Sequence, residues 1–238
     1  MRLRKVMKLG IFGGTFNPIH YGHLRAAEEV REKLKLDKII FVPSGNPPMK
    51  DRELADARHR YKMVRLAAFK NRSFTVSDIE YKKKNKSYSV NTLKELHRLY
   101  KGARLYFILG IDAFIDIPNW WQPDKLVSLT DFVVISRPSF RFEELSSSPY
   151  LEADGNILKR LDSGKIESYK TGLKGGRDII MMRLTALSIS ATLIRKLLHQ
   201  DKSIKYLLPE EVESYIISTK LYKIKEGGKT LKKLKKQR

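Results

Sequence analysis

Short apolar runs rich in β-branched and aromatic residues recur along the chain, and glycine, proline or charged residues interrupt them. Runs of about four to eight such residues are typical of buried strands. They lie at residues 8–14, 38–44, 74–81, 104–112, 131–138 and 179–184. The pattern therefore predicts a strand at each of these places.

Amphipathic stretches fill most of the intervals between these runs. In the first of them, Leu24, Ala27, Val30 and Leu34 recur at helical spacing, with charged residues on the other side. Strands that alternate with helices form a mostly parallel sheet covered on both faces, so we expect a doubly wound α/β fold. Helices are predicted at residues 22–36, 57–71, 89–100, 190–200 and 209–222.

Residues 139–177 break this alternation. The stretch is rich in serine, glycine and charged residues and carries only short apolar groups. We expect it to be irregular, with one helix within residues 150–161. No internal repeat is evident along the chain.

The composition is that of a globular protein. The chain has 238 residues, of which 42% are hydrophobic, enough for one large α/β domain or two small ones. No run of about 20 apolar residues could span a bilayer, and the basic start reaches glycine before a signal-peptide core develops, so we expect a cytoplasmic protein. Cysteine is absent, which excludes disulfides and thiolate nucleophiles and leaves oxygen or histidine ligands for any metal.

The charge is strongly positive. A formal net charge of +22 favours anionic partners, namely nucleotides, nucleic acid or anionic lipid, and does not choose among them. Part of the excess lies in residues 223–238, where lysines crowd together. We expect this segment to be a basic, flexible tail.

The stretch "GIFGGTFNPIHYGHL" carries the first candidate chemistry. Gly13 and Gly14 follow an apolar strand and are expected to allow a tight turn and a close ligand approach. A helix that begins near Tyr21 would offer its first amides to an anion, with His20 and His23, three residues apart, facing the same way. The spacing matches neither a dinucleotide fingerprint nor a Walker loop. Structural histidines and a histidine metal site, for which no third ligand is evident nearby, are the alternatives.

The segment "SISATLIRKLL" carries the second group of residues with candidate chemistry. Ser190 or Thr192 can cap a helix, and Arg195, one turn later, can reach an anion that the helix end attracts. The alternative is an ordinary capped helix with a surface arginine.

Unusual residues follow several of the predicted strands. The segments "GGTFNPIHYGH", "PSGNPPMK", "GIDAF" and "RPS" each come directly after an apolar run. In doubly wound sheets, ligands bind beyond the carboxyl ends of the strands. We therefore expect these segments to form one site.

Together these motifs resemble a known family. "GGTFNPIHYGH" and "ISATLIR" resemble the signatures of the nucleotidylyltransferase superfamily, and "PSGNPPMK", "KSYSVNTL", "FILGIDAF", "IPNWW", "ISRPS" and "LLPEEVESYIISTKLY" are similar, in order and spacing, to the bacterial nicotinate-nucleotide adenylyltransferases. The resemblance extends from about Lys8 to Tyr222. It implies a Rossmann-like nucleotidylyltransferase fold and one catalytic domain over residues 1–222. Four residues depart from the usual pattern: Asn17 (often Asp), Ser44 (often Asn), Met49 (often His) and Ser89 (usually Thr).

The resemblance implies adenylyl transfer from ATP to nicotinate mononucleotide, with Mg²⁺ as cofactor. It implies catalytic roles for His20, His23 and Arg195. The residues expected to bind ATP are Gly13, Gly14, Thr15, Phe16, His20, His23, Gly110, Asp112, Ser190, Thr192 and Arg195. Those expected to bind nicotinate mononucleotide are Ser44, Lys50, Tyr88, Ser89, Asp112, Trp120, Trp121 and Arg137.

Simpler interpretations stay open for several of these residues. Asp112 could be a helix N-cap, Trp120 and Trp121 could be core residues, and Lys50 and Arg137 could be surface charges.

Other functions also stay open. Another adenylyl- or cytidylyltransferase of the superfamily is the nearest alternative, although "SYSVNT" and "IPNWW" match the nicotinate enzymes. The charge also suggests a nucleic-acid-binding protein, but no RNA- or DNA-binding signature is recognisable, so we expect small-molecule substrates and no specific nucleic acid or membrane partner. Homo-oligomerisation stays open.

Overall fold

The computed structural model describes residues 6–47, 53–83 and 85–223. A seven-stranded sheet runs through it, with strand order β3-β2-β1-β4-β5-β7-β6. Neighbouring strands are parallel except β6, which is antiparallel to β7. The strands are β1 (Lys8–Gly14), β2 (Lys38–Pro43), β3 (Phe74–Val76), β4 (Arg104–Gly110), β5 (Asp131–Ile135), β6 (Ser168–Gly172) and β7 (Asp178–Met182).

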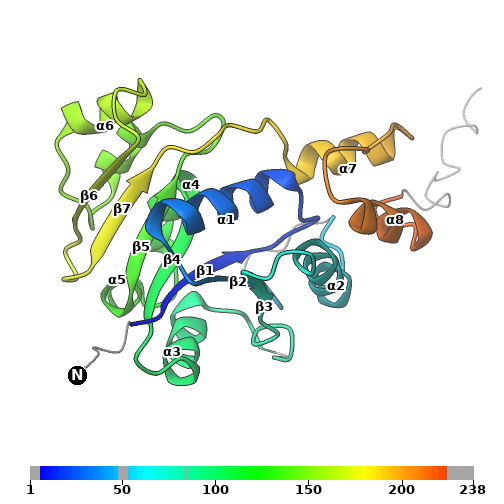
Figure 1. Cartoon of the computed structure of the whole chain (residues 1–238), viewed down its shortest axis with the longest axis horizontal. Coiled ribbons are helices and arrows are strands. Elements are labelled where there is room, and N and C mark those ends of the chain that lie inside the picture. Colours follow the sequence, from blue (N-terminus) through cyan, green and yellow to red (C-terminus); the bar gives the residue numbers. More distant parts are fainter. Residues whose placement is uncertain (1–5, 48–52, 84, 224–238) are drawn as a thin grey trace, which may run out of the picture.

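Helices cover both faces of this sheet, which confirms the predicted doubly wound fold. Apolar residues of α1, α2, α7 and α8 pack on one face, and those of α3, α4, α5 and α6 pack on the other. Figure 1 shows α1 lying across the sheet, with α3 and α5 on the opposite side. The helices are α1 (Tyr21–Leu34), α2 (Ala57–Ala68), α3 (Ser89–Leu99), α4 (Ile111–Ile115), α5 (Pro123–Leu129), α6 (Gly155–Asp162), α7 (Ala191–His199) and α8 (Glu210–Ser218), with 3₁₀ turns η1 (Ile117–Asn119) and η2 (Phe142–Ser147).

The strand order places the site. The chain runs outward from β1 to β2 and β3 and then returns to β4 on the other side of β1. In an open α/β sheet the crevice for a ligand lies where the order reverses, beyond the carboxyl ends of the strands. Here that point lies between the ends of β1 and β4, at Gly14 and Gly110.

The predicted elements differ from the structure mainly at their ends and in the second half of the chain. The run at 74–81 forms a strand only over Phe74–Val76, because the chain then turns, with the Lys82 amide donating to the Asp78 carbonyl. The helices between β4 and β5 were not predicted, since their apolar residues are divided among three short segments.

The prediction of an irregular stretch at 139–177 is wrong in part. It contains α6, which overlaps the one helix expected there, and the edge strand β6. The β6 sequence "SYKTG" has no apolar run, because only alternate residues are partly buried against the rest of the molecule. The expected tail at 223–238 lies, apart from Lys223, outside the described residues.

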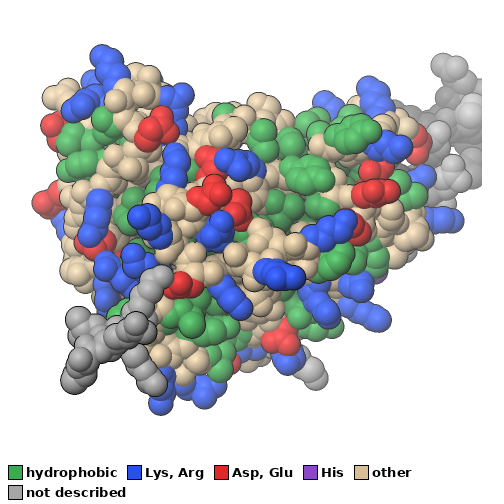
Figure 2. All heavy atoms as spheres, viewed as in Figure 1, with side chains coloured by type: hydrophobic (Ala, Val, Ile, Leu, Met, Phe, Trp, Pro, Cys, Tyr) green, Lys and Arg blue, Asp and Glu red, His purple; other side chains and the backbone are tan. Residues whose placement is uncertain are grey.

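The described residues form short helices and a surface of mixed charge (Figure 2). None of their helices is both long and apolar enough to cross a membrane. Figure 2 shows Lys and Arg side chains spread over the visible face and interspersed with Asp and Glu, rather than gathered in one band.

Candidate active site

The loop after β1 carries the two histidines. α1 begins at Tyr21, as predicted, and His20 is its N-cap. The His20 and His23 rings lie with their centroids 3.8 Å apart, and the His20 amide donates to His23 Nδ1 at 3.3 Å. Both side chains therefore occupy the place where a helix N-terminus attracts an anion.

Both imidazoles are held in the neutral form. Burial lowers the pKa of His20 from 6.5 to about 4, and the nearby positive charge of Arg137 lowers it further. Burial also lowers the pKa of His23 well below 6.5, and the electrostatic effects of His20 and Arg137 lower it further. A neutral imidazole carries one N–H donor, so at neutral pH each ring can donate one hydrogen bond.

The turn that presents these rings is not made by the glycines, which corrects the sequence-based expectation. Gly13 and Gly14 end β1, and the left-handed conformation falls on Phe16, with φ of 49°. A Cβ on Gly14 would lie 2.9 Å from the Phe16 ring. A side chain at position 14 would displace the Phe16 ring, so glycine allows this ring to fold back against the end of β1.

Phe16 supports His23 rather than lining an open site. Its side chain is buried, and its ring lies 5.1 Å from the His23 ring in an edge-to-face arrangement. Any contact of Phe16 with a ligand would therefore come from its backbone. Thr15, in contrast, is exposed beside it.

The ends of β4 and β5 bring a third group of predicted residues to the same edge. Gly110 is the N-cap of α4, so the alternative that Asp112 is the N-cap is wrong. Asp112 forms an ion pair with Arg137, which follows β5. Arg137 lies close enough to both histidines to lower their pKa values. Asp112 and Arg137 thus lie at the same edge of the sheet as the two histidines.

The segment before α7 carries a fourth group of predicted residues. Ser190 is the N-cap of α7 and accepts a hydrogen bond from the Leu193 amide at 3.1 Å, so the cap is Ser190 and not Thr192. Thr192 is exposed. Arg195 is only 7% exposed, which excludes the alternative of a surface arginine.

The contacts of Arg195 point into the β1 loop. Its Nη1 donates to the Asn17 carbonyl at 2.9 Å, and its Nε donates to Glu53 Oε2 at 3.0 Å. The helix that carries the second motif is thereby fixed to the loop that carries the first. Two motifs separated by more than half of the chain are therefore in direct contact.

Tyr88, Ser89 and the two tryptophans form the neighbouring aromatic region. Tyr88 is the N-cap of α3, Ser89 is its first residue, and the Tyr88 and Trp121 ring centroids are 5.5 Å apart. Trp120 donates from Nε1 to Asp116 Oδ2 at 2.9 Å and packs against the core, whereas Trp121 is 55% exposed. The core interpretation holds in part for Trp120 and fails for Trp121.

Ser44 connects this region to the histidine loop. Its amide donates to the Gly14 carbonyl at 2.9 Å. Two residues later, the Asn46 amide donates to Ser87 Oγ, and the Asn46 carbonyl accepts from the Ser87 amide. The strand-end loops predicted to form one site are therefore adjacent. Lys50 lies outside the described residues.

Sequence reasoning missed several residues that organise the site. Asn17 was noted only as a departure from the family pattern, and Glu53 and Arg60 were not singled out. Arg60 is 1% exposed and donates hydrogen bonds to the backbone carbonyls of Thr15 and Ser44. The burial of Arg60 would have identified it, but the sequence shows only an arginine among other charged residues of an amphipathic helix.

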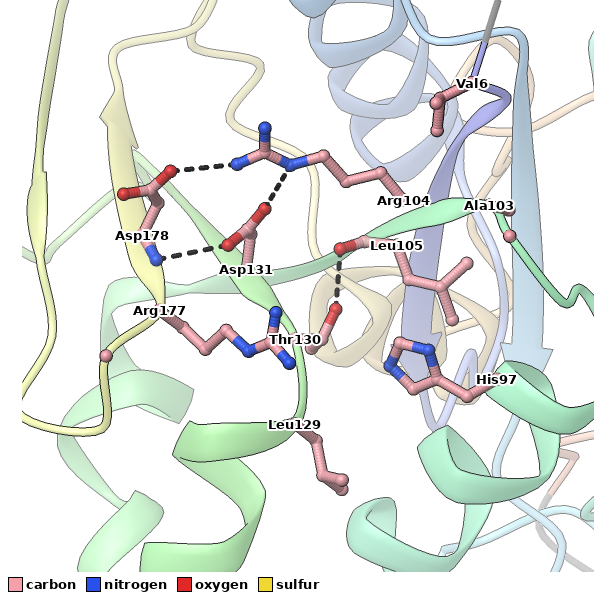
Figure 3. Close-up of a pocket in the computed structure, with 12 residues that line it drawn as sticks. Val6, His97, Ala103, Arg104, Leu105, Leu129, Thr130, Asp131, Arg177 and Asp178 are labelled. Carbon is pink, nitrogen blue, oxygen red and sulfur yellow. Dashed lines mark hydrogen bonds and ion pairs between the residues drawn. The ribbon is translucent and has the colours of Figure 1, made fainter. Parts of the chain in front are cut away.

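A separate cavity of about 410 Å³ lies at the amino ends of β4, β5 and β7, opposite the site (Figure 3). Its charged groups are largely paired with one another, since Arg104 donates to both Asp131 and Asp178. None of the predicted site residues lines it.

The fold and this strand-end site define a protein of the cytidylyltransferase-like class, whose family model matches residues 11–197. A relative from Thermoanaerobacter sp. (strain X514), named "Probable nicotinate-nucleotide adenylyltransferase", is 42% identical over 223 residues, covering 93% of this chain and 97% of that protein. A relative of the same name from Desulfitobacterium hafniense (strain Y51) is 44% identical over 218 residues, covering 91% and 96%. The chain belongs to the nicotinate-nucleotide adenylyltransferase family.

A solved structure agrees with the fold. The nicotinic acid mononucleotide adenylyltransferase of Plasmodium falciparum, complexed with NaAD, matches with a TM-score of 0.68 over 91% of this chain and 97% of that chain. The two sequences are 24% identical, so this match concerns the arrangement of the backbone.

Proposed function

We propose that this chain transfers the adenylyl group of ATP to nicotinate mononucleotide, giving nicotinate adenine dinucleotide and pyrophosphate, a step of NAD biosynthesis. The observation that carries the proposal is the pair of neutral imidazoles, His20 and His23, whose ring centroids lie 3.8 Å apart at the N-terminus of α1, where the strand order reverses. Family membership supports it. A cytoplasmic location suits a reaction that consumes ATP.

The proposed chemistry does not require an acid–base dyad. A phosphate oxygen of the mononucleotide attacks the α-phosphorus of ATP, and the bond between that phosphorus and the oxygen bridging to the β-phosphorus breaks. The electron pair leaves with pyrophosphate. The attacking phosphate is already ionised at neutral pH, so the site must mainly align two anions and neutralise the leaving group.

The residues around the histidines suit that task. In the proposal, His20, His23 and the first amides of α1 donate to the triphosphate, and Gly13, Gly14, Thr15 and the Phe16 backbone line the junction between the substrates. Since a bound triphosphate favours the charged imidazole, ATP should raise both histidine pKa values. Gly110 and Asp112 would lie beside the ribose and adenine.

Arg195, Ser190 and Thr192 are proposed to hold the β- and γ-phosphates. The Arg195 guanidinium contacts the Glu53 carboxylate, whose side chain is 47% exposed. A triphosphate carries more negative charge than one carboxylate and accepts bidentate hydrogen bonds from arginine. Exchange of Glu53 for phosphate at Arg195 is therefore electrostatically favourable.

Magnesium is the proposed cofactor. The described residues contain no group of three or more His, Asp or Glu side chains placed to hold a metal by themselves. Magnesium in nucleotide sites keeps water and phosphate oxygens as ligands and needs one or two carboxylates at most. Asp112 Oδ1 is buried with no hydrogen-bond donor among the described residues, so a suitable oxygen is present. Bound with ATP, the ion would neutralise charge on the phosphates.

The aromatic region is proposed to hold the mononucleotide. Trp120, fixed by its bond to Asp116, would stack on the pyridine ring, while Tyr88, Ser89 and the backbone near Trp121 meet its carboxylate. Ser44, Asp112, Arg137 and Lys50 complete the proposed set, in which Arg137 and Lys50 are the proposed partners of the mononucleotide phosphate.

Turnover of nicotinate and nicotinamide mononucleotides by one enzyme preparation tests this assignment. A hydroxyl and backbone amides donate hydrogen bonds, which satisfy a carboxylate and oppose the donors of an amide. Two or three mismatches at about 1–3 kcal/mol each predict a kcat/KM preference of roughly 10² to 10⁴ for the acid, measured as pyrophosphate release. Because Ser89 lacks the methyl group of threonine, we expect a ratio toward the lower end of this range.

A ratio near one, or a preference for the amide, would contradict the nicotinate assignment and spare adenylyl transfer. Absence of pyrophosphate release with either mononucleotide would contradict the proposed reaction itself.

A further inference from the structure

Two features of its position, the helix dipole and burial, disfavour a positive charge on Arg60. It lies in the first turn of α2, at the positive end of the helix dipole, and its side chain is 1% exposed. Burial lowers the pKa of its guanidinium. Such a charge persists inside a protein only where specific hydrogen bonds satisfy it, so its contacts show what it does.

Four backbone carbonyls surround the guanidinium. Nε donates to Ala55 at 2.9 Å, Nη1 donates to Thr15 at 2.9 Å and to Ser44 at 2.5 Å, and Nη2 donates to Gly45 at 2.9 Å. These carbonyls come from the loop after β1, from the loop after β2, and from the residue two places before α2. One planar group therefore joins three backbone segments.

Glu80 lies on the other side of the peptide group that joins Ser44 to Gly45. This carboxyl group is buried, the Gly45 amide lies close enough to oppose the rise that burial causes in its pKa, and it accepts a hydrogen bond from the Thr92 hydroxyl at 2.7 Å. A Cβ on Gly45 would lie 2.1 Å from the Glu80 carbonyl oxygen. The Ser44–Gly45 peptide is thus held between a buried cation and a buried carboxyl group, and glycine is required there.

The joined loops are the ones proposed to hold the two substrates. Thr15 belongs to the loop after β1, which also carries the histidines proposed to contact the triphosphate, and Ser44 belongs to the loop after β2, proposed to contact the mononucleotide. An in-line displacement depends on the distance between the attacking oxygen and the α-phosphorus, and an error of about 1 Å can cost about 10²-fold in rate.

We infer that Arg60 is a positioning residue for the transfer reaction, one that sets the separation of the Thr15 and Ser44–Gly45 loops and so aligns the two substrates. The inference rests on the proposed function. Arg60 touches neither substrate in this account. Its loss should therefore reduce kcat more than it raises either KM.

Arg60→Lys is the principal variant. A lysine keeps the charge but has one nitrogen, which cannot reach carbonyls on three sides as a guanidinium does. We expect kcat to fall about 10- to 100-fold and both KM values to stay within about threefold. Arg65→Lys, at an exposed position on the same helix, is the matched control and should behave as wild type. Arg60→Gln, which removes the buried charge, replaces Arg60→Lys if that variant does not fold.

Leu158→Ala separates positioning from stability. Leu158 is buried in α6, in the core on the other face of the sheet. Its truncation should destabilise the protein without moving either loop. At a temperature where all variants are folded, we expect Leu158→Ala to keep near-normal kcat. Equal losses of kcat in Leu158→Ala and Arg60→Lys would overturn the inference, as would an unchanged kcat in Arg60→Lys.

Amide hydrogen exchange gives a readout that does not require activity. In Arg60→Lys, exchange should accelerate together at residues 14–16 and 44–46, whereas in Glu80→Gln it should accelerate chiefly at 44–46. Unchanged exchange at either loop in Arg60→Lys would contradict the joining role. If wild type releases no pyrophosphate, the proposed function fails while the exchange result still decides whether Arg60 joins the loops.

Discussion

Tyr222 Oη donates a hydrogen bond to Asn17 Oδ1 at 2.8 Å, across 205 positions of sequence. Asn17 Oδ1 also accepts from the Ala55 amide at 3.1 Å, and Asn17 Nδ2 donates to the Glu53 carbonyl at 3.1 Å. Burial raises the pKa of Tyr222, so its hydroxyl stays a donor over the physiological range. The loop that carries His20 is thereby fastened to a residue near the end of the described chain.

Tyr222→Phe should lower the free energy of unfolding by about 1 kcal/mol, the usual net value of one buried hydrogen bond. Asn17 keeps its other partners, so the loop should remain folded and turnover should change little. Urea denaturation measures the effect, with Tyr206→Phe as the control because Tyr206 is 88% exposed. Equal stability in the two variants would show that the Tyr222 hydroxyl contributes nothing.

His23→Ala should lower kcat by about 10²-fold or more, the scale for loss of one preorganised donor to a transition state. The ring also packs against Phe16 and Phe12, so circular dichroism and thermal unfolding must accompany the assay. His97→Ala, at the opposite cavity, is the control. A folded His23→Ala protein with near-normal turnover would remove His23 from the phosphate site.

Acid should destabilise the protein through His20. Its pKa is about 4 in the folded state and 6.5 in the unfolded state, so between these values only the unfolded chain takes up the proton. The stabilisation is complete above pH 6.5 and is lost as pH falls toward 4, by about 3 kcal/mol in all. Urea unfolding at pH 7, 6, 5 and 4 should show a smaller loss for His20→Asn than for wild type. Parallel curves would contradict the lowered pKa.

Arg195→Lys should impair the use of ATP selectively. One amine cannot replace the Nη1 contact to Asn17 and the Nε contact to Glu53 together, nor present a planar fork to phosphate. We expect KM for ATP to rise about tenfold and KM for the mononucleotide to change less than about twofold. Lys196→Arg, at the exposed neighbouring position, is the control. Equal damage to both substrates would mean that Arg195 organises the whole loop through Asn17.

Local pattern in the sequence determined the main architecture and the approximate site. β1 and α1 were predictable because apolar residues recur at strand and helix spacing. His20 and His23 stood out because glycines weaken strands and histidines seldom fill apolar space, so a structural core rarely needs both together. Strand β6 was not predictable in this way. It is a polar edge strand whose position depends on pairing with β7.

Tertiary structure alone decided which residues hold the site together. In the sequence, Arg60 is one charged residue among several on an amphipathic helix, and it becomes a buried hub because the loops after β1 and β2 meet at its guanidinium. The lowered pKa values of His20 and His23 likewise arise from burial and from Arg137, which lies more than 100 positions away in the sequence. Periodicity reports which face of an element is buried. The partners of a buried polar group depend on how distant loops are brought together, and that information resides in the folded chain.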